Sequence, residues 1–205
     1  MRLSLNSTGG KVLASTVVLG AAATIAGLGT FGSFTSTTGA SESAGTGTVV
    51  IGLAGSGTDN RLSVAATGLV PGDTVQRVVK LNNTGSQNLA SVTLTTAATT
   101  TSVLDTDATN GLQLKLDSCS VPWTEAGTSP AYTYTCSGTT TSVLASHAVI
   151  GSAMALSNLS SLTAGASDNL KVTLSFPSAA DNTFQNKSSV IGFTFDALQR
   201  TATDR

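Results

Sequence analysis

Short segments in which apolar and polar residues alternate run through most of this sequence, and turns rich in Gly, Asn, Asp or Pro separate them. In the clearest example, Ile191, Phe193 and Phe195 are separated by single small or polar residues. A repeat of two places alternate side chains on opposite faces of a half-buried strand. The segments predicted as strands are 48–53, 61–66, 74–82, 89–96, 112–118, 131–136, 171–176 and 190–198. Short strands with turns every ten residues or so predict a two-sheet antiparallel sandwich.

The composition agrees with an all-β fold. Charged residues make up 10% of the 205 residues and aromatic residues 4%, while Thr, Ser, Gly and Ala dominate. Thr and Val fit a pleated sheet well, and the helix formers Glu and Lys are scarce. The length suits one well-buried domain and is short for two. The region 139–162 fits either strands or a short helix, so at most one or two short helices are expected.

The first 33 residues have the features of an export signal. Arg2 and Lys11 precede a run, 12–34, that has no charged residue and is rich in Ala, Val, Leu and Gly. The alternative is a transmembrane anchor, since about 20 apolar residues span a bilayer. The Thr, Ser and Gly residues that dilute the run favour the signal. We therefore expect a secreted protein whose only membrane contact is this segment before cleavage.

The charge of the chain gives no sign of a basic patch that would bind a polyanionic partner. The formal net charge is −1, from 10 Lys and Arg and 11 Asp and Glu. Loss of residues 1–33 removes two basic residues and no acid, which leaves 8 basic and 11 acidic residues, or −3. Because nucleic-acid binding needs a basic patch, no nucleic-acid partner is expected.

A low-charge stretch, 34–47, lies between the signal and the first predicted strand. It consists mainly of Thr, Ser, Gly and Ala, carries one charged residue, Glu42, and has no apolar periodicity. This pattern predicts a flexible N-terminal arm. The sandwich domain is then expected over 48–200, followed by a polar C-terminal tail, 201–205.

Cys119 and Cys136 are the two cysteines of the chain. An even number of cysteines in an exported chain predicts a disulfide. The segments 112–116 and 131–134 both alternate, so the cysteines are expected on adjacent strands, either side of a loop that contains Pro122 and Pro130. Closing such a loop stabilises a fold by about 3 kcal/mol in the chain-entropy model. The alternative is a pair of free thiols or half of a metal site.

Three segments carry a resemblance to a known family. The first is the Asp-Asn-x-Phe-Gln-x-x-Ser turn at 181–188, with a strand that ends in Ala-x-Gln at 197–199. The second is the Pro-Gly-Asp turn at 71–73, with an alternating strand and an Asn-x-Gly-Ser turn at 83–86. The third is the small-residue segment 29–37. Together they resemble the TasA/camelysin (peptidase M73-like) family of secreted bacterial proteins, in which a SipW-type signal peptidase processes the N-terminus. The motif residues are Pro71, Gly72, Asp73, Asp181, Asn182, Phe184, Gln185, Ser188 and Gln199.

This resemblance implies a jelly-roll-like sandwich and a structural function. It implies an extracellular subunit that polymerises with copies of itself into fibres of the cell surface or biofilm matrix, with or without an anchoring or initiating protein. The N-terminal arm of one subunit is then expected to add as a strand to the next. A low-charge arm suits such addition to an open sheet edge. The expected assembly residues are Phe34, Thr35, Ser36, Thr37 and Thr38.

The camelysin name also implies a zinc metallopeptidase, which is the alternative function. That chemistry usually needs two His on one helix, with a Glu as general base. His147 is the only histidine, and no acidic residue lies within ten positions of it. We therefore expect no catalytic residues, metal or cofactor, and interpret His147 as structural.

Two further clusters have a functional and a structural interpretation each. Asp105, Asp107 and Asn110 offer oxygens to calcium, but the Glu that ends a calcium loop is missing, so a polar turn is favoured. The aromatic residues near the cysteines suit either a sugar-stacking face of a monomeric adhesin or the protein core, which is the commoner case. These aromatic residues are Trp123, Tyr132 and Tyr134.

Overall fold

The structure, a computed structural model, describes residues 35–37, 43–44, 47–55, 57–62 and 68–201. The chain divides into two units, and only the second, Thr35–Arg205, contains described residues. The predicted export signal therefore lies outside them, as do Phe34 and Thr38 of the predicted arm.

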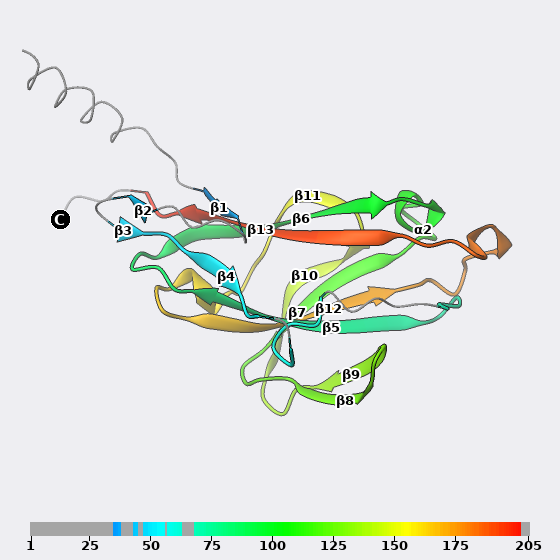
Figure 1. Cartoon of the computed structure of the whole chain (residues 1–205), viewed down its shortest axis with the longest axis horizontal. Coiled ribbons are helices and arrows are strands. Elements are labelled where there is room, and N and C mark those ends of the chain that lie inside the picture. Colours follow the sequence, from blue (N-terminus) through cyan, green and yellow to red (C-terminus); the bar gives the residue numbers. More distant parts are fainter. Residues whose placement is uncertain (1–34, 38–42, 45–46, 56, 63–67, 202–205) are drawn as a thin grey trace, which may run out of the picture. The chain divides into compact units, whose positions relative to one another are not determined.

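Two antiparallel sheets form the body of this unit (Figure 1). The four-stranded sheet has the order β1 (Thr35–Thr37), β13 (Val190–Gln199), β6 (Leu89–Thr100) and β11 (Gly151–Ala155). The five-stranded sheet has the order β10 (Thr140–Ala148), β7 (Gln113–Cys119), β12 (Ser167–Ser175), β5 (Thr74–Asn83) and β4 (Ile51–Leu53). Two hairpins are separate: β2 (Ser43–Ala44) with β3 (Gly47–Thr48), and β8 (Thr124–Thr128) with β9 (Ala131–Thr135).

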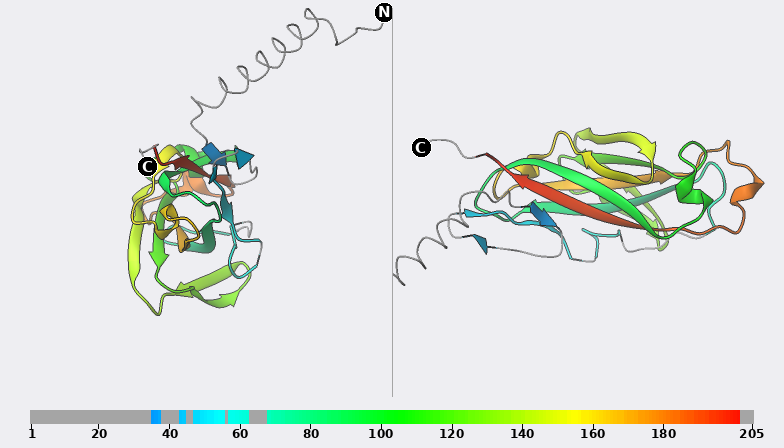
Figure 2. Two further views of the ribbon diagram at one scale, coloured as in Figure 1. Left: turned by 90° about the vertical axis from the view of Figure 1, so that its left-hand side faces the viewer. Right: turned by 90° about the horizontal axis from the view of Figure 1, so that it is seen from above.

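The apolar positions predicted from the alternation meet between the two sheets. Leu94 and Phe195 of the four-stranded sheet and Leu116, Leu170 and Val79 of the five-stranded sheet are almost fully buried in one cluster. Burying side chains of this size stabilises a fold by about 1.5–3 kcal/mol each. The chain passes repeatedly from one sheet to the other between β5 and β13, so the all-β sandwich prediction is confirmed (Figure 2).

Helical structure is limited to single turns. α2 (Val103–Thr106) is capped by Ser102, and η1 (Ser160–Leu162) and η2 (Asn182–Phe184) are 3-10 turns. None of the helices in the described part of the chain is long and apolar enough to span a bilayer.

Three details of the sequence prediction are corrected. Arg61 and Leu62 are not in a strand, although Asn60 forms an isolated bridge with Val79; residues 63–66 lie outside the described residues. The ambiguous region 139–162 forms β10, β11 and η1. The predicted loop with Pro122 and Pro130 contains the β8–β9 hairpin.

The disulfide forms between Cys119 and Cys136, but not across adjacent strands. Cys119 ends β7, which pairs with β10 and β12, while Cys136 follows β9, which pairs with β8. The expectation of adjacent strands was wrong because the intervening residues pair with each other. The disulfide therefore closes the base of the β8–β9 hairpin.

Both sheets have an irregular edge strand on one side. β10 pairs with β7 through two register shifts, and β11 pairs with β6 through one, near Ala153, which has a φ of 48°. The Thr95 and Thr96 hydroxyls accept hydrogen bonds from the N–H groups of Ala153 (3.0 Å) and Gly151 (2.9 Å). Such bulges interrupt the regular ladder and protect an edge from pairing with another chain.

Candidate functional site

The outer edge of β13 is the candidate site, because β1, the first described strand of the N-terminal arm, lies on it. β1 pairs antiparallel with the end of β13: Thr35 lies opposite Leu198, Ser36 opposite Ala197 and Thr37 opposite Asp196. β6 pairs with the other side of β13 along nearly its whole length.

The direction of the main-chain groups of β13 follows from the neighbouring strands. Leu156 N–H donates to Val92 O (3.0 Å), so the even-numbered residues of β6 direct their main-chain groups towards β11. The odd-numbered residues then face β13, in pairs such as Thr95 with Thr194. By the same alternation, Ile191, Phe193 and Phe195 direct their N–H and C=O groups to the outer edge.

Beyond the β1 pairing, β13 carries no charged residue from Val190 to Phe195, and its pairing with β6 runs in continuous register from Ile191 to Leu198, between two register shifts at Val190/Ile191 and Leu198/Gln199. In the described ranges no strand pairs with Val190 to Phe195 on the side away from β6. Phe195 is buried and Val190 is exposed, so the strand has one apolar side chain in the core and another at the surface. A regular edge of this kind is a template for an added strand.

The C-terminal family motif precedes β13. The Asp181 carboxylate accepts hydrogen bonds from the N–H (2.9 Å) and hydroxyl (2.6 Å) of Thr183, which caps η2 and lowers the Asp181 pKa. The Gln185 amide donates to Asn182 (3.1 Å), and the Phe184 ring is buried. Ser188 is exposed and Gln199 lies opposite Leu89 at the end of β13.

The Pro-Gly-Asp motif meets this turn at Phe176. Gly72, which has a φ of 100°, donates its N–H to Phe176 O (2.8 Å), and Phe176 N–H donates to Asp73 O (2.8 Å). The Phe176 and Phe184 rings pack edge to face, with centroids 5.5 Å apart. Two motifs about 110 residues apart in the chain are thus joined, and their contacts are structural.

Asp105 ties α2 to the residue just before β13. Its carboxylate accepts hydrogen bonds from Thr101 (2.6 Å), from Ser102 N–H (2.7 Å) and from the Ser189 hydroxyl. Burial alone would raise the pKa of Asp105, but these hydrogen bonds outweigh it and lower the pKa.

The Asp107 carboxylate is also used in hydrogen bonds within its own turn. One of its oxygens accepts hydrogen bonds from the N–H groups of Thr109 and Asn110 (both 2.9 Å), and these bonds lower the Asp107 pKa. The contacts of Asp105 and Asp107 therefore favour the polar turn over a calcium loop.

His147 lies on β10, opposite Leu114. Its Nδ1 contacts Ala148 O at 2.5 Å, and its Nε2 is buried without a hydrogen-bond partner among the described residues. Within those same residues no group of three or more His, Cys, Asp and Glu side chains is placed to hold a metal ion.

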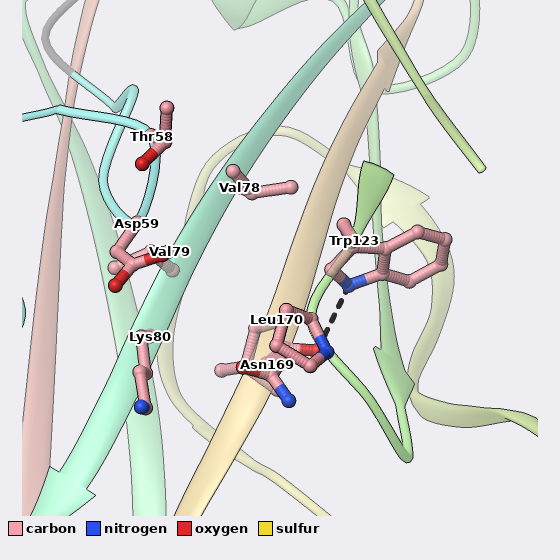
Figure 3. A pocket seen from close by; sticks show the side chains of 9 residues that line it. Thr58, Asp59, Val78, Val79, Lys80, Trp123, Asn169 and Leu170 are labelled. Carbon is pink, nitrogen blue, oxygen red and sulfur yellow. Dashed lines mark hydrogen bonds between the residues drawn. The ribbon is translucent and has the colours of Figure 1, made fainter. Parts of the chain in front are cut away.

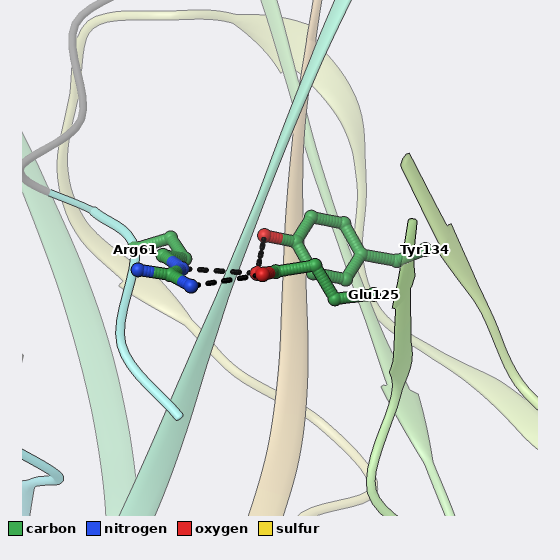
Figure 4. A network of polar contacts seen from close by, with 3 residues as sticks. All are labelled: Arg61, Glu125 and Tyr134. Carbon is green, nitrogen blue, oxygen red and sulfur yellow. Dashed lines mark hydrogen bonds and ion pairs between the residues drawn. The ribbon is translucent and has the colours of Figure 1, made fainter. Parts of the chain in front are cut away.

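Tyr132 and Tyr134 are held by polar and charged side chains, and Figure 4 shows the contacts of Tyr134. Arg61 donates two hydrogen bonds to Glu125 (2.9 and 2.8 Å), and the Tyr134 hydroxyl donates to the same carboxylate (2.8 Å). The Arg61 and Arg77 guanidinium carbons lie 4.9 and 5.8 Å from the Tyr132 ring centre. These contacts attach the β8–β9 hairpin to the segment that follows β4.

The ionisation of this cluster follows from the same contacts. The hydrogen bond from Arg61 lowers the pKa of Glu125, and burial acts in the opposite direction. The hydrogen bond from the Tyr134 hydroxyl lowers the pKa further. Burial raises the pKa of Tyr134, and Glu125 raises it further.

Trp123 is also held by two contacts, and Figure 3 shows the hydrogen bond to Asn169. Its indole N–H donates to Asn169 O (2.9 Å), and the Lys171 ammonium lies 4.4 Å from the ring centre. The cavity beside it, lined also by Asp59 and Lys80, has a volume of about 20 Å³, which is room for about one water. The contacts of the three aromatic residues therefore favour a structural role over a sugar-stacking face.

A larger hollow of about 450 Å³ lies beside the end of β6. It is lined mainly by small apolar residues, Ala97, Ala98, Ala108 and Ala148, together with Asp105, whose carboxylate is already hydrogen-bonded. Thr106, which also lines it, donates its hydroxyl to Ser102 O (3.1 Å), so the polar side chains of this lining are already hydrogen-bonded.

The fold defines a class: all-β antiparallel sandwich proteins. A sequence model for the camelysin metallo-endopeptidase family matches residues 9–204 of this chain. The chain therefore belongs to the camelysin family, whose members are typically extracellular. A search of curated proteins gives no match.

Proposed function

We propose that this protein is a secreted structural subunit that forms fibres of the cell surface or extracellular matrix. The N-terminal arm of one copy adds as a strand to a sheet of the next copy. The supporting observation is the register of β1 on β13, in which residues of the arm form a strand on a sheet edge.

The chemistry of the arm suits this role. Residues 34–41 carry no charge, so pairing with an apolar edge removes no charged group from water. Main-chain hydrogen bonds contribute about 0.5–1.5 kcal/mol each, so an added strand needs several of them to offset the ordering of the arm. The expected partner is another copy of the chain, with or without an anchoring protein, and no cofactor is involved.

Electron microscopy of the chain that begins at Phe34 tests this function. We expect filaments by negative stain, and their loss when residues 34–44 are deleted, with a melting curve close to that of the longer chain. Ser36→Pro removes the N–H that alternation directs at Ala197, so it should also abolish filaments, whereas Ser36→Thr should keep them. Filaments from the deleted chain would contradict assembly through the arm.

We further propose that the chain acts without peptidase chemistry, despite the description of its family. The support is the small number of side chains that could bind zinc through nitrogen or sulfur. The chain has one histidine, and both of its cysteines are in a disulfide. Elemental analysis and casein hydrolysis with and without a chelator test this proposal. Stoichiometric zinc with chelator-sensitive hydrolysis would overturn it.

A further inference from the structure

We propose that Asn186 is a glycosylation site, at which an oligosaccharide is joined to the side-chain amide on export of the chain. The segment Asn186-Lys187-Ser188 has the Asn-x-Ser pattern that acceptor sites for N-linked sugars share. The proposal requires export and does not require the assembly of fibres.

The Asn-x-Ser/Thr pattern occurs at four places in the chain, and the structure distinguishes among them. The first, at Asn6, lies in the predicted export signal and outside the described residues. The second, at Asn82, lies within β5, where Asn82 is paired with Ser167 of β12 on one side and with Gly52 of β4 on the other. A residue with a neighbouring strand on each side is not accessible to an enzyme unless the sheet opens.

The third pattern, at Asn158, is exposed but already bonded. The Asn158 side-chain amide donates a hydrogen bond to Ser142 O (3.0 Å), and Ser160 N–H donates to the Asp168 carboxylate (2.9 Å). The amide nitrogen that would receive the sugar is therefore in use.

The surroundings of Asn186 are different. It lies with Lys187 and Ser188 in the turn between η2 and β13, at one end of the sandwich (Figure 1), and all three residues are exposed. Among the described residues, neither the Asn186 amide nor the Ser188 hydroxyl has a hydrogen-bond partner. Both groups that the pattern requires are thus free at the surface.

Backbone conformation explains the asparagine but not the serine. Asn186 has a φ of 55°, in the left-handed region, which Asn adopts more readily than most residues that have a side chain. The Ser188 hydroxyl makes no hydrogen bond with another described residue, so the turn gives no reason for a hydroxyl two positions after Asn186. Recognition by a glycosylating enzyme supplies a reason, because this hydroxyl is part of the acceptor pattern.

The reaction is a group transfer from a lipid-linked oligosaccharide diphosphate, catalysed by an oligosaccharyltransferase of the exporting membrane. The Asn186 Nδ2 forms a bond to the first carbon of the sugar, and the bond between that carbon and the diphosphate oxygen breaks. The lipid diphosphate leaves with the electron pair of the broken bond, and Nδ2 gives up one proton. No oxidant or reductant takes part.

A sugar at this position is compatible with the proposed function. β1 lies opposite Asp196–Leu198, whereas Asn186 precedes Val190, the first residue of β13. At about 3.3 Å per residue, the strand from Val190 to Asp196 spans about 20 Å, so a sugar on Asn186 leaves the β1 contact free.

Mass spectrometry of the chain secreted by its own organism tests the proposal. Chymotrypsin cuts after Phe184 and Phe193 and keeps the pattern in one peptide, whereas trypsin would divide it after Lys187. We expect a sugar on Asn186 in this peptide and no sugar on Asn158.

Variants of the turn separate recognition of the pattern from the effects of folding. Ser188→Ala should remove the sugar although Asn186 is unchanged, and Ser188→Thr should retain it. Asn186→Gly should also remove it, and glycine accepts the left-handed conformation. Asn158→Gln, in the other exposed pattern, is the matched control and should leave the sugar unchanged. Circular dichroism confirms that each variant is folded.

The possible results separate this proposal from the fibre function. A secreted chain with an unmodified Asn186 would overturn the glycosylation site, as would a sugar that persists in Ser188→Ala. Either result leaves the fibre function standing, which microscopy tests by itself. A chain that its organism does not secrete would overturn both.

Discussion

Glu125 joins two segments that are 64 residues apart, because its carboxylate accepts hydrogen bonds from Arg61 and from Tyr134. The pair is partly exposed, and exposed ion pairs alone contribute little to stability. Here the Glu125 carboxylate accepts three hydrogen bonds, two of them from the planar guanidinium of Arg61. The paired geometry of these two bonds holds the hairpin in one orientation.

The lowered pKa of Glu125 predicts an acid-sensitive hairpin. Such a carboxylate contributes stability above its unfolded pKa, about 4.3, and loses it as pH falls through the lower folded pKa. Glu125→Gln should therefore lower the melting temperature at neutral pH. On acidification, the melting temperature of this variant should fall by less than that of the wild type. Thermal melts at about pH 7 and about pH 3 measure this, with Asp204→Asn as a control for general charge. An equal fall in melting temperature on acidification for wild type and Glu125→Gln would contradict the prediction.

Ala153 adopts a left-handed conformation that glycine tolerates better. Its φ of 48° in the β11 bulge costs a non-glycine residue about 1 kcal/mol. Ala153→Gly should therefore stabilise the fold by up to about 1 kcal/mol in urea unfolding. Ala155→Gly, at a position in the same strand without a positive φ, should destabilise it by a similar amount. Equal effects at both positions would show that the bulge carries no backbone strain.

At the scale of elements, the β8–β9 hairpin depends on its disulfide as well as on Glu125. The bridge spans a sequence separation of 17 residues, so Cys119→Ser with Cys136→Ser should cost about 3 kcal/mol of stability. The hairpin should also become the first site of limited proteolysis, while the strands of the two sheets stay protected. Urea unfolding and mass spectrometry of the fragments test this. Unchanged stability and cleavage elsewhere would show that the ion pair alone holds the hairpin.

Strands with a strong apolar alternation were predicted closely from the sequence. The predictions 190–198 and 74–82 match Val190–Gln199 and Thr74–Asn83, since their buried faces meet one core. β8 was missed because Thr124–Thr128 has no apolar alternation and is held by an ion pair and a disulfide instead.

The candidate site was only partly predictable. The arm and the motif before β13 were identified from local sequence patterns, and the disulfide from the cysteine count. The acceptor edge depends on which strands pair with β13, and Thr95 and Thr194 are 99 residues apart. A local pattern holds no information about pairing over such a separation.

At the scale of the whole molecule, low charge predicts an assembly that tolerates salt. The chain that begins at Phe34 carries 8 basic and 11 acidic residues, a net charge of −3, and the proposed contact uses uncharged main-chain groups. Salt screens charges beyond about 10 Å at 0.1 M, so raising NaCl from about 0.05 to about 0.5 M should leave filament yield within about twofold. Sedimentation and microscopy measure the yield. A loss of filaments at high salt would indicate a charged interface elsewhere on the subunit.

The bulges of β10 and β11 bear on how many neighbours a subunit can join in the proposed fibre. In that fibre each chain gives one arm and receives one, and the bulged edges are not expected to pair with a further chain. A unit with one donor and one acceptor links into unbranched chains with a distinct leading and trailing end. Growth at the two ends is therefore expected to differ in rate, and a single copy that lacks its arm should terminate one end only.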